Sequence, residues 1–232
     1  MKPSVKKLTE LNTQTPNPMY FEPNHCYHIY NQGNNRQKIF FNRDNYLYFL
    51  NKIRQHILPY ADILAWCLMP NHFHLMVRVN FVELETNNEQ RNPDTTHPMT
   101  SSHRMSSNKS VSINQSIAIM LRSYTRAINK SRNMTGSLFR AKTKAECLTK
   151  QNGITPSFFN SNQGTLIFTP GQLPDYLQTC FNYIHKNPVR ANLAKEIADW
   201  EFSSAPDYYG IRQGSLINKT LASELNIRFL GE

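Results

Sequence analysis

The chain has 232 residues, with 26 Lys and Arg against 16 Asp and Glu, so its formal net charge is +10. This length is enough for one domain with its own core, and no run reaches the roughly 18 apolar residues that a membrane helix needs. The N-terminus lacks the apolar centre of a secretory signal, and the four scattered cysteines form no C-x-x-C pair. These features predict a cytoplasmic protein with reduced thiols and no membrane partner.

The positive charge is concentrated between residues 101 and 150. Ten Lys and Arg lie there, against the single acid Glu146. Such a block suits a polyanion, although a solvated surface is an alternative that charge alone does not exclude. A membrane surface fits less well, because no basic amphipathic helix carries a Trp, Phe and Leu face.

The elements of the N-terminal half are predicted in chain order. Residues 1–23, which contain four prolines, form a predicted flexible arm. Aromatic and β-branched residues that end at a glycine predict a strand at 25–33, and apolar spacings of three and four predict a helix at 43–58. The continuous apolar run 62–69 fits a strand buried on both faces. A Pro-Asn turn joins it to a strand at 72–79, so these two strands should pair antiparallel.

Two polar segments, at about 82–111 and 150–172, interrupt the second half of the chain and are predicted to be mobile insertions. Between them, one apolar stripe and one basic row predict an amphipathic helix at 112–130. A strand is predicted at 136–148, where alternation would place the basic residues on one face.

A last long helix is predicted at 173–187, and Pro188 is expected to end it. Residues 211–232 are interpreted as a C-terminal tail behind a single domain at 24–210. The order β-α-β-β-α-β-α predicts an α+β fold, in which a ferredoxin-like antiparallel sheet has its helices packed on one face.

His72 and His74 are unusual residues for an otherwise hydrophobic strand. Residues i and i+2 of a strand share a face, so both imidazoles project together while Phe73 and Leu75 face the opposite core. Two neighbouring imidazoles can bind a metal, but a tight site needs a further ligand. The alternative is a pair of partly buried histidines bonded to backbone, and the desolvation cost of two such groups weighs against it.

The stretch AWCLMPNHFHLMV, residues 65–77, resembles the signature of the IS200-like single-tyrosine HUH transposases. It is more similar still to that of their relatives, the REP-associated tyrosine transposases. The family name HUH describes His-hydrophobic-His, here His72-Phe73-His74. The run YIHKNPVRANL, residues 183–193, resembles the family's second signature, a tyrosine followed four residues later by asparagine and then Pro-Val-Arg.

Two shorter runs, GNNRQKIF at 33–40 and LFRAKTKAE at 138–146, also resemble segments of this family. The resemblance covers roughly residues 20–210 apart from the two polar insertions. A lone His-x-His motif is weak, whereas two long signatures in the expected order are specific.

The resemblance implies a transposase that cleaves and rejoins single-stranded DNA through a 5′-phosphotyrosine intermediate. Tyr183 would be the nucleophile, and His72, His74 and Asn187 would hold one divalent metal, Mg²⁺ or Mn²⁺, with Zn²⁺ as an alternative. The implied partner is single-stranded DNA, with a hairpin beside the cleavage site, and the implied location is the nucleoid. A homodimer is left open. The alternative function is a non-catalytic DNA hairpin-binding protein of the same fold.

The spacing of Tyr183 and Asn187 supports these roles, because residues four apart lie on the same face of a helix. A packing aromatic is the alternative for Tyr183. Tyr124 is the rival nucleophile, but it falls on the apolar stripe of its helix and is predicted to be core. Three histidines are candidates for a general base: His28, His56 and His185. Seven basic residues are predicted to bind DNA phosphates: Arg122, Arg126, Lys130, Arg140, Lys142, Lys144 and Arg190.

Overall fold

The computed structural model describes residues 19–86, 109–150, 158–161, 164–167 and 173–229. Most of the predicted N-terminal arm and most of the two predicted insertions lie outside these residues. Residues 19–23 of the arm are described, and Phe21 is buried in the core rather than part of a flexible arm. No helix of the described chain is both long enough and apolar enough to cross a bilayer.

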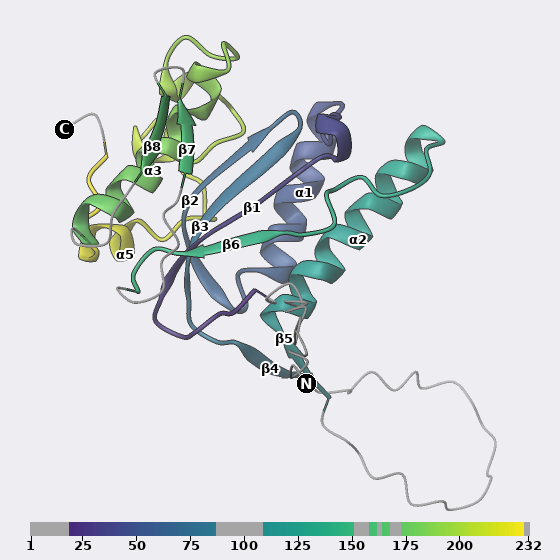
Figure 1. Cartoon of the computed structure of the whole chain (residues 1–232), viewed down its shortest axis with the longest axis horizontal. Helices are drawn as coiled ribbons and strands as arrows, with labels where there is room; N and C mark the ends of the chain where they lie inside the picture. The colour runs from purple at the N-terminus through teal and green to yellow at the C-terminus, as the bar shows by residue number, and fades with distance from the viewer. Residues whose placement is uncertain (1–18, 87–108, 151–157, 162–163, 168–172, 230–232) are drawn as a thin grey trace, which may run out of the picture.

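A four-stranded antiparallel sheet forms the centre of the fold (Figure 1). It contains β1 (Cys26–Gln32), β2 (Ala61–Met69), β3 (His72–Val79) and β6 (Lys144–Cys147), in the order β2-β3-β1-β6. Each neighbouring pair is antiparallel. The predicted ferredoxin-like antiparallel sheet is therefore confirmed.

Two helices, α1 (Arg43–His56) and α2 (Ile113–Arg132), cover one face of the sheet. Their apolar stripes meet every second residue of the strands in one core. Side-chain caps fix where they begin. The Asn42 side chain accepts from the Asn45 N–H at 3.0 Å, and Ser112 forms a capping box with Gln115.

The opposite face is covered by α3 (Leu173–Arg190), α4 (Ala205–Tyr208) and α5 (Lys219–Glu224), which corrects the expectation that helices pack on one face. The physical reason lies in β2, where eight of nine residues are buried, so both of its sides need apolar cover. Leu221 and Ile227, from the segment interpreted as a tail, are buried in this second core.

Two predicted elements have different ends in the structure. The strand expected at 136–148 is confined to β6. Helix α3 continues through Pro188, which was expected to end it. Because Pro188 lies in the last turn, its missing N–H removes one bond to the preceding turn. The bond from the Ala191 N–H to the Asn187 carbonyl, 3.0 Å, then completes the turn.

The described parts of the predicted insertions form two separate ribbons. Strand β4 (Glu83–Thr86) pairs with β5 (Lys109–Ser112), and β7 (Phe158–Ser161) pairs with β8 (Gly164–Ile167). Short 3₁₀ turns, η1 (Asn34–Arg36) and η2 (Ile197–Asp199), complete the described elements.

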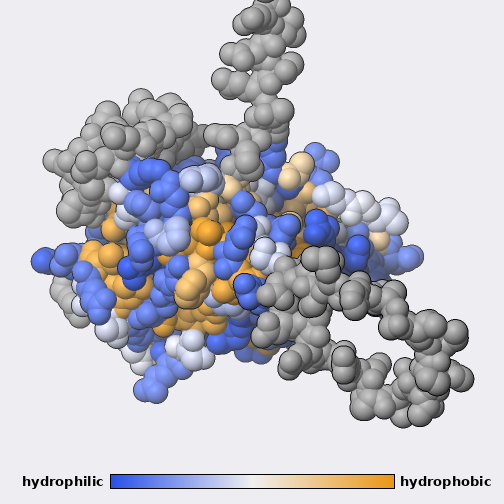
Figure 2. Space-filling model, turned by 90° about the horizontal axis from the view of Figure 1, so that it is seen from below, coloured by the Kyte–Doolittle hydropathy of each residue, from blue (hydrophilic) through white to orange (hydrophobic). Residues whose placement is uncertain are grey.

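Some large apolar side chains remain at the surface. On the side of the molecule seen in Figure 2, hydrophobic side chains lie among hydrophilic ones. The most exposed in the described chain are Tyr20, Ile211 and Phe81, at 72%, 69% and 55%. Scattered exposure of this kind is ordinary for a globular domain and indicates no particular partner.

The buried histidine of α3 predicts a pH dependence of stability. His185 is 2% exposed, its Nε2 lies 2.7 Å from Ser204 Oγ, and burial lowers its pKa from 6.5 to about 3. The unfolded chain therefore binds a proton, between these two values, that the native state does not. The free energy of unfolding should fall as the pH decreases from 6.5 towards 3.

In His185→Gln this contribution is absent. Between pH 3 and pH 6.5, the slope of unfolding free energy against pH should therefore be shallower than in wild type by up to about 1.4 kcal/mol per pH unit. Urea denaturation over a series of pH values measures it. Parallel profiles for the two proteins would contradict the prediction.

Candidate functional site

A cavity of about 250 Å³ brings together residues from β1, β3, α3 and the segment that leads into β6. We call it the histidine cavity. Its lining comprises Tyr30, Asn31, Gln32, His72, Phe73, His74, Arg140, Lys142, Lys144 and Tyr183. Six of the residues singled out from the sequence therefore line one cavity, although Tyr183 is more than a hundred residues from the histidines along the chain.

The two histidines of β3 lie side by side, as the period of two predicts. Their ring centroids are 5.0 Å apart, while Phe73 and Leu75 are buried in the α1/α2 core behind them. His72 is half-buried and its Nδ1 lies 2.6 Å from the Asn71 Oδ1. His74 is 4% exposed.

A third imidazole, that of His28 on β1, forms a hydrogen bond with His74. His28 is 1% exposed, and its Nε2 lies 2.9 Å from His74 Nδ1. One of these two nitrogens must donate. If His74 Nδ1 donates, its Nε2 keeps a lone pair for a ligand. Within the described residues, His74 Nε2 and His28 Nδ1 are both buried without a hydrogen-bond partner.

Burial keeps all three imidazoles uncharged at neutral pH. It lowers the pKa of His28 to about 3 and that of His72 to about 4. The pKa of His74 falls well below 6.5, mainly through burial, with the charges of His28 and His72 adding to the effect. Neutral imidazole is the form that coordinates metals.

Tyr183 reaches the same cavity from α3. Its ring centroid lies 5.4 Å from that of His74 and 6.1 Å from that of His28, all within one chain. Burial raises the pKa of Tyr183, whereas a hydrogen bond with the Asn187 side chain and the Arg190 charge lower it. The Arg190 guanidinium lies 5.8 Å from the ring centroid. The phenol is therefore protonated at neutral pH and must lose its proton when it attacks.

Asn187 lies one turn beyond Tyr183. Its Nδ2 donates to the Tyr183 carbonyl at 2.8 Å, and it does not belong to the cavity lining. The convergence of His72, His74 and Asn187 on one point thus stays a prediction.

The donor set defines what kind of metal site is chemically reasonable. In the part of the chain that the structure describes, no three His, Cys, Asp or Glu side chains are placed to hold a metal. A metal here would depend on two imidazoles together with amide, water and substrate oxygens, a mixed set that suits Mn²⁺ or Mg²⁺. The unpartnered, buried His74 Nε2 and the neutral imidazoles fit such an ion.

The basic residues named from the sequence fall into separate places. Arg140, Lys142 and Lys144 are exposed and line the histidine cavity, although the first two precede β6. Exposed Arg190 lies beside Tyr183. The exposed row of α2 lies outside this cavity: Arg122, Arg126 and Lys130.

The other candidates are used elsewhere in the fold. Tyr124 is fully buried, and its hydroxyl donates to the Ile39 carbonyl at 2.8 Å, which confirms it as core. His56 lies 3.3 Å from Ser116 Oγ, and His185 bonds Ser204 in the second core. Of the three general-base candidates, the structure brings His28 to the site.

Sequence reasoning gave no role to Glu146, whose Oε1 accepts from the Tyr30 hydroxyl at 2.6 Å. Burial and this bond raise the pKa of Tyr30. Two signals in the sequence could have revealed this contact. His28 and Tyr30 are two residues apart on β1 and so share a face, and Glu146 is the lone acid of the basic block, on the strand that pairs with β1.

Neither a family model nor a curated protein matches this chain. A solved structure, described as a REP-associated tyrosine transposase bound to a REP hairpin, aligns with 82% of this chain and 82% of its own length. The two share 14% sequence identity, with a TM-score of 0.47. A likeness of this size does not establish a family.

Proposed function

We propose that the protein is a metal-dependent enzyme that cleaves and rejoins single-stranded DNA, a single-tyrosine HUH transposase of the REP-associated kind. One observation carries the proposal. The ring centroid of the Tyr183 phenol lies 5.4 Å from that of the neutral imidazole His74, in a cavity that is lined by basic side chains. That combination suits attack on a phosphodiester, because the cations bind the phosphate and the phenol supplies the nucleophile.

In the proposed reaction, Arg140, Lys142 and Lys144 hold the DNA backbone at the rim. His72 and His74, with Asn187, would hold Mg²⁺ or Mn²⁺, which when bound supplies Lewis-acid polarisation of the scissile phosphate. The Tyr183 oxygen forms a bond to phosphorus as the bond to the 3′ oxygen breaks. The phenol gives up its proton, and the 3′ oxygen leaves as a hydroxyl.

The resulting 5′-phosphotyrosine keeps the energy of the broken bond. A free 3′-hydroxyl from a second strand end can attack the same phosphorus and release Tyr183, so rejoining needs no nucleotide cofactor. A phenol is a better leaving group than an aliphatic alcohol, because its oxygen is far more acidic, so Tyr183 can be released in this return step.

Covalent trapping tests the proposal. The protein is incubated with labelled single-stranded oligonucleotides, with and without hairpins, in Mn²⁺ or in a chelator, and resolved on a denaturing gel. We expect an adduct in Mn²⁺ and none in the chelator. Tight binding of a hairpin without an adduct on any of these DNAs would instead favour a non-catalytic hairpin-binding protein.

His28 gives a further prediction, because its bond to His74 fixes the orientation and tautomer of that ring. His28→Leu should weaken Mn²⁺ binding about 10- to 100-fold, as loss of a partner behind a metal ligand usually does. It should also lower the free energy of unfolding by about 1–3 kcal/mol, because His74 Nδ1 is left buried without a partner.

The matched variant is His28→Gln, whose amide can reach the position of Nε2 and should recover most of the Mn²⁺ affinity. Titration calorimetry and urea denaturation measure the two effects. Equal Mn²⁺ affinity in wild type and His28→Leu would exclude a positioning role for His28.

A further inference from the structure

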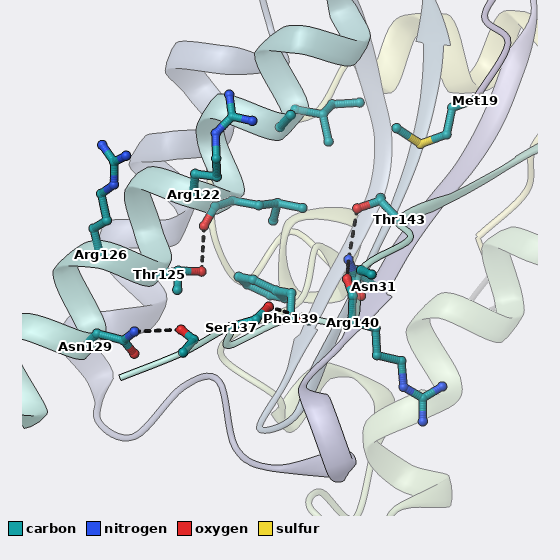
Figure 3. Close-up of a pocket in the computed structure, with 15 residues that line it drawn as sticks. Met19, Asn31, Arg122, Thr125, Arg126, Asn129, Ser137, Phe139, Arg140 and Thr143 are labelled. Atoms are coloured by element: carbon teal, nitrogen blue, oxygen red, sulfur yellow. Dashed lines mark hydrogen bonds between the residues drawn. The ribbon is translucent and has the colours of Figure 1, made fainter. Parts of the chain in front are cut away.

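A second cavity, of about 510 Å³, lies between α2 and the segment 136–143 (Figure 3). We call it the α2 groove. Arg122 and Arg126 project from α2 along one wall, and Arg140 comes from the opposite wall and points away from them. The groove is lined beneath these cations by apolar residues, including Leu121 and Phe139.

The α2 groove and the histidine cavity share a wall. Asn31 and Arg140 line both of them. A single extended ligand that passes Arg140 would therefore reach His72 and His74 at one end and the α2 arginines at the other.

The groove is built before any ligand arrives. The Asn31 Nδ2 donates to the Arg140 carbonyl at 3.1 Å and to Thr143 Oγ1 at 2.9 Å, which ties the segment to β1. At the other end, the Asn129 Nδ2 donates to the Gly136 carbonyl at 2.8 Å and joins α2 to the same segment. Both walls are thus held by hydrogen bonds, so little ordering is needed on binding.

The charge of the two cavities is of one sign. No Asp or Glu belongs to the described lining of either. Arg122, Arg126 and Arg140 line the α2 groove, and Arg140, Lys142 and Lys144 line the histidine cavity. Guanidinium groups match phosphate in geometry and charge, and an apolar floor can accept sugars and bases. A solvated basic surface would need neither the hollow nor a wall shared with the histidine cavity.

We propose that the α2 groove binds the backbone of the same single DNA strand whose scissile phosphate occupies the histidine cavity. The assignment of the ligand as single-stranded DNA rests on the proposed function. Arg140 then lies at the passage between the two sites, and Arg122 and Arg126 hold phosphates several nucleotides away from the cleaved bond.

A salt series measures the phosphate contacts. Binding of a fluorescent oligothymidylate is followed by anisotropy in chelator, so that no cleavage occurs. In Arg122→Gln/Arg126→Gln we expect several-fold weaker binding, and a plot of log affinity against log salt that is shallower by about 1.4, since each contact to a single strand contributes about 0.7.

The matched control is Arg54→Gln/Arg228→Gln, which removes the same charge from exposed residues outside both cavities. Its slope should equal that of wild type. Equal slopes for the two double variants would overturn the inference.

A second pair of variants tests whether the volume of the α2 groove is needed for binding, without a change in charge. Ala118→Trp would fill the groove, whereas Ile119→Trp places the same bulk on an exposed neighbouring position, 41% exposed, outside the lining. Several-fold weaker binding in Ala118→Trp alone, with circular dichroism unchanged in both, supports the groove. Equal affinity in the two variants, or tighter binding of duplex than of single strand, overturns the proposal.

The outcome separates this inference from the proposed function. If the wild-type chain forms no covalent adduct but Arg122→Gln/Arg126→Gln lowers the salt slope, the proposed reaction fails and the groove stands. If the adduct forms and this variant binds DNA as its control does, the groove fails and the reaction stands.

Discussion

Tyr183→Phe should reduce the covalent DNA–protein adduct by at least about 10³-fold, because it removes the attacking oxygen. The ring itself is kept, along with its packing at 5.4 Å from His74. DNA affinity in chelator should therefore stay close to that of wild type. The adduct is measured on a denaturing gel, and affinity is measured by anisotropy.

Tyr124→Phe is the matched control for this variant. Its hydroxyl donates to the Ile39 carbonyl, in a core on the other side of the sheet from the histidine cavity. Its removal should cost about 1–3 kcal/mol of unfolding free energy and leave the adduct in place. An adduct that persists in Tyr183→Phe but disappears in Tyr124→Phe would transfer the nucleophilic role to Tyr124.

His72→Ala should reduce both Mn²⁺ affinity and the adduct, the latter by about 10³-fold, since a metal at a phosphoryl centre stabilises the transition state by several kcal/mol. His72 is the better choice for this test because it is half-buried, whereas His74 is packed against His28 and its loss would also leave a hole. Calorimetric titration with Mn²⁺ and adduct yield at rising Mn²⁺ are the two measurements.

His25→Ala provides the comparison for His72→Ala, because His25 bonds Thr149 outside the histidine cavity. It should keep wild-type Mn²⁺ affinity. If His72→Ala also keeps it, the two imidazoles of β3 serve as hydrogen-bonding groups and the metal part of the proposal is wrong. Loss of the adduct with intact Mn²⁺ affinity would place His72 against the DNA.

Local patterns predicted much of the fold. The period of two in β3 placed Phe73 in the core and the histidines opposite, and the stripe of α2 placed Tyr124 inside. These predictions succeed because a side chain's direction relative to its own strand or helix follows from backbone geometry alone.

The incorrect predictions concern where elements end and which elements pack on each other. Pro188 does not end α3, because a proline in the last turn removes a single bond that the helix can lose. The unbroken apolar run of β2 already implied a second helical layer. In a sheet covered on one face only, apolar and polar residues would alternate along the strand. The strand expected at 136–148 is confined to β6, and residues between 136 and 143 line the α2 groove instead.

The sequence by itself determined the strands of the central sheet, its three long helices, the common face of His72 and His74, and the buried place of Tyr124. Only the tertiary structure decided which groups meet across the chain. The register of β1 against β3 brings His28 to His74, and the packing of α3 against the sheet brings Tyr183 to the same cavity. Arg140 lines both cavities because Asn31 ties its segment to β1. Such contacts depend on strand register and helix docking between distant segments, which no local period encodes.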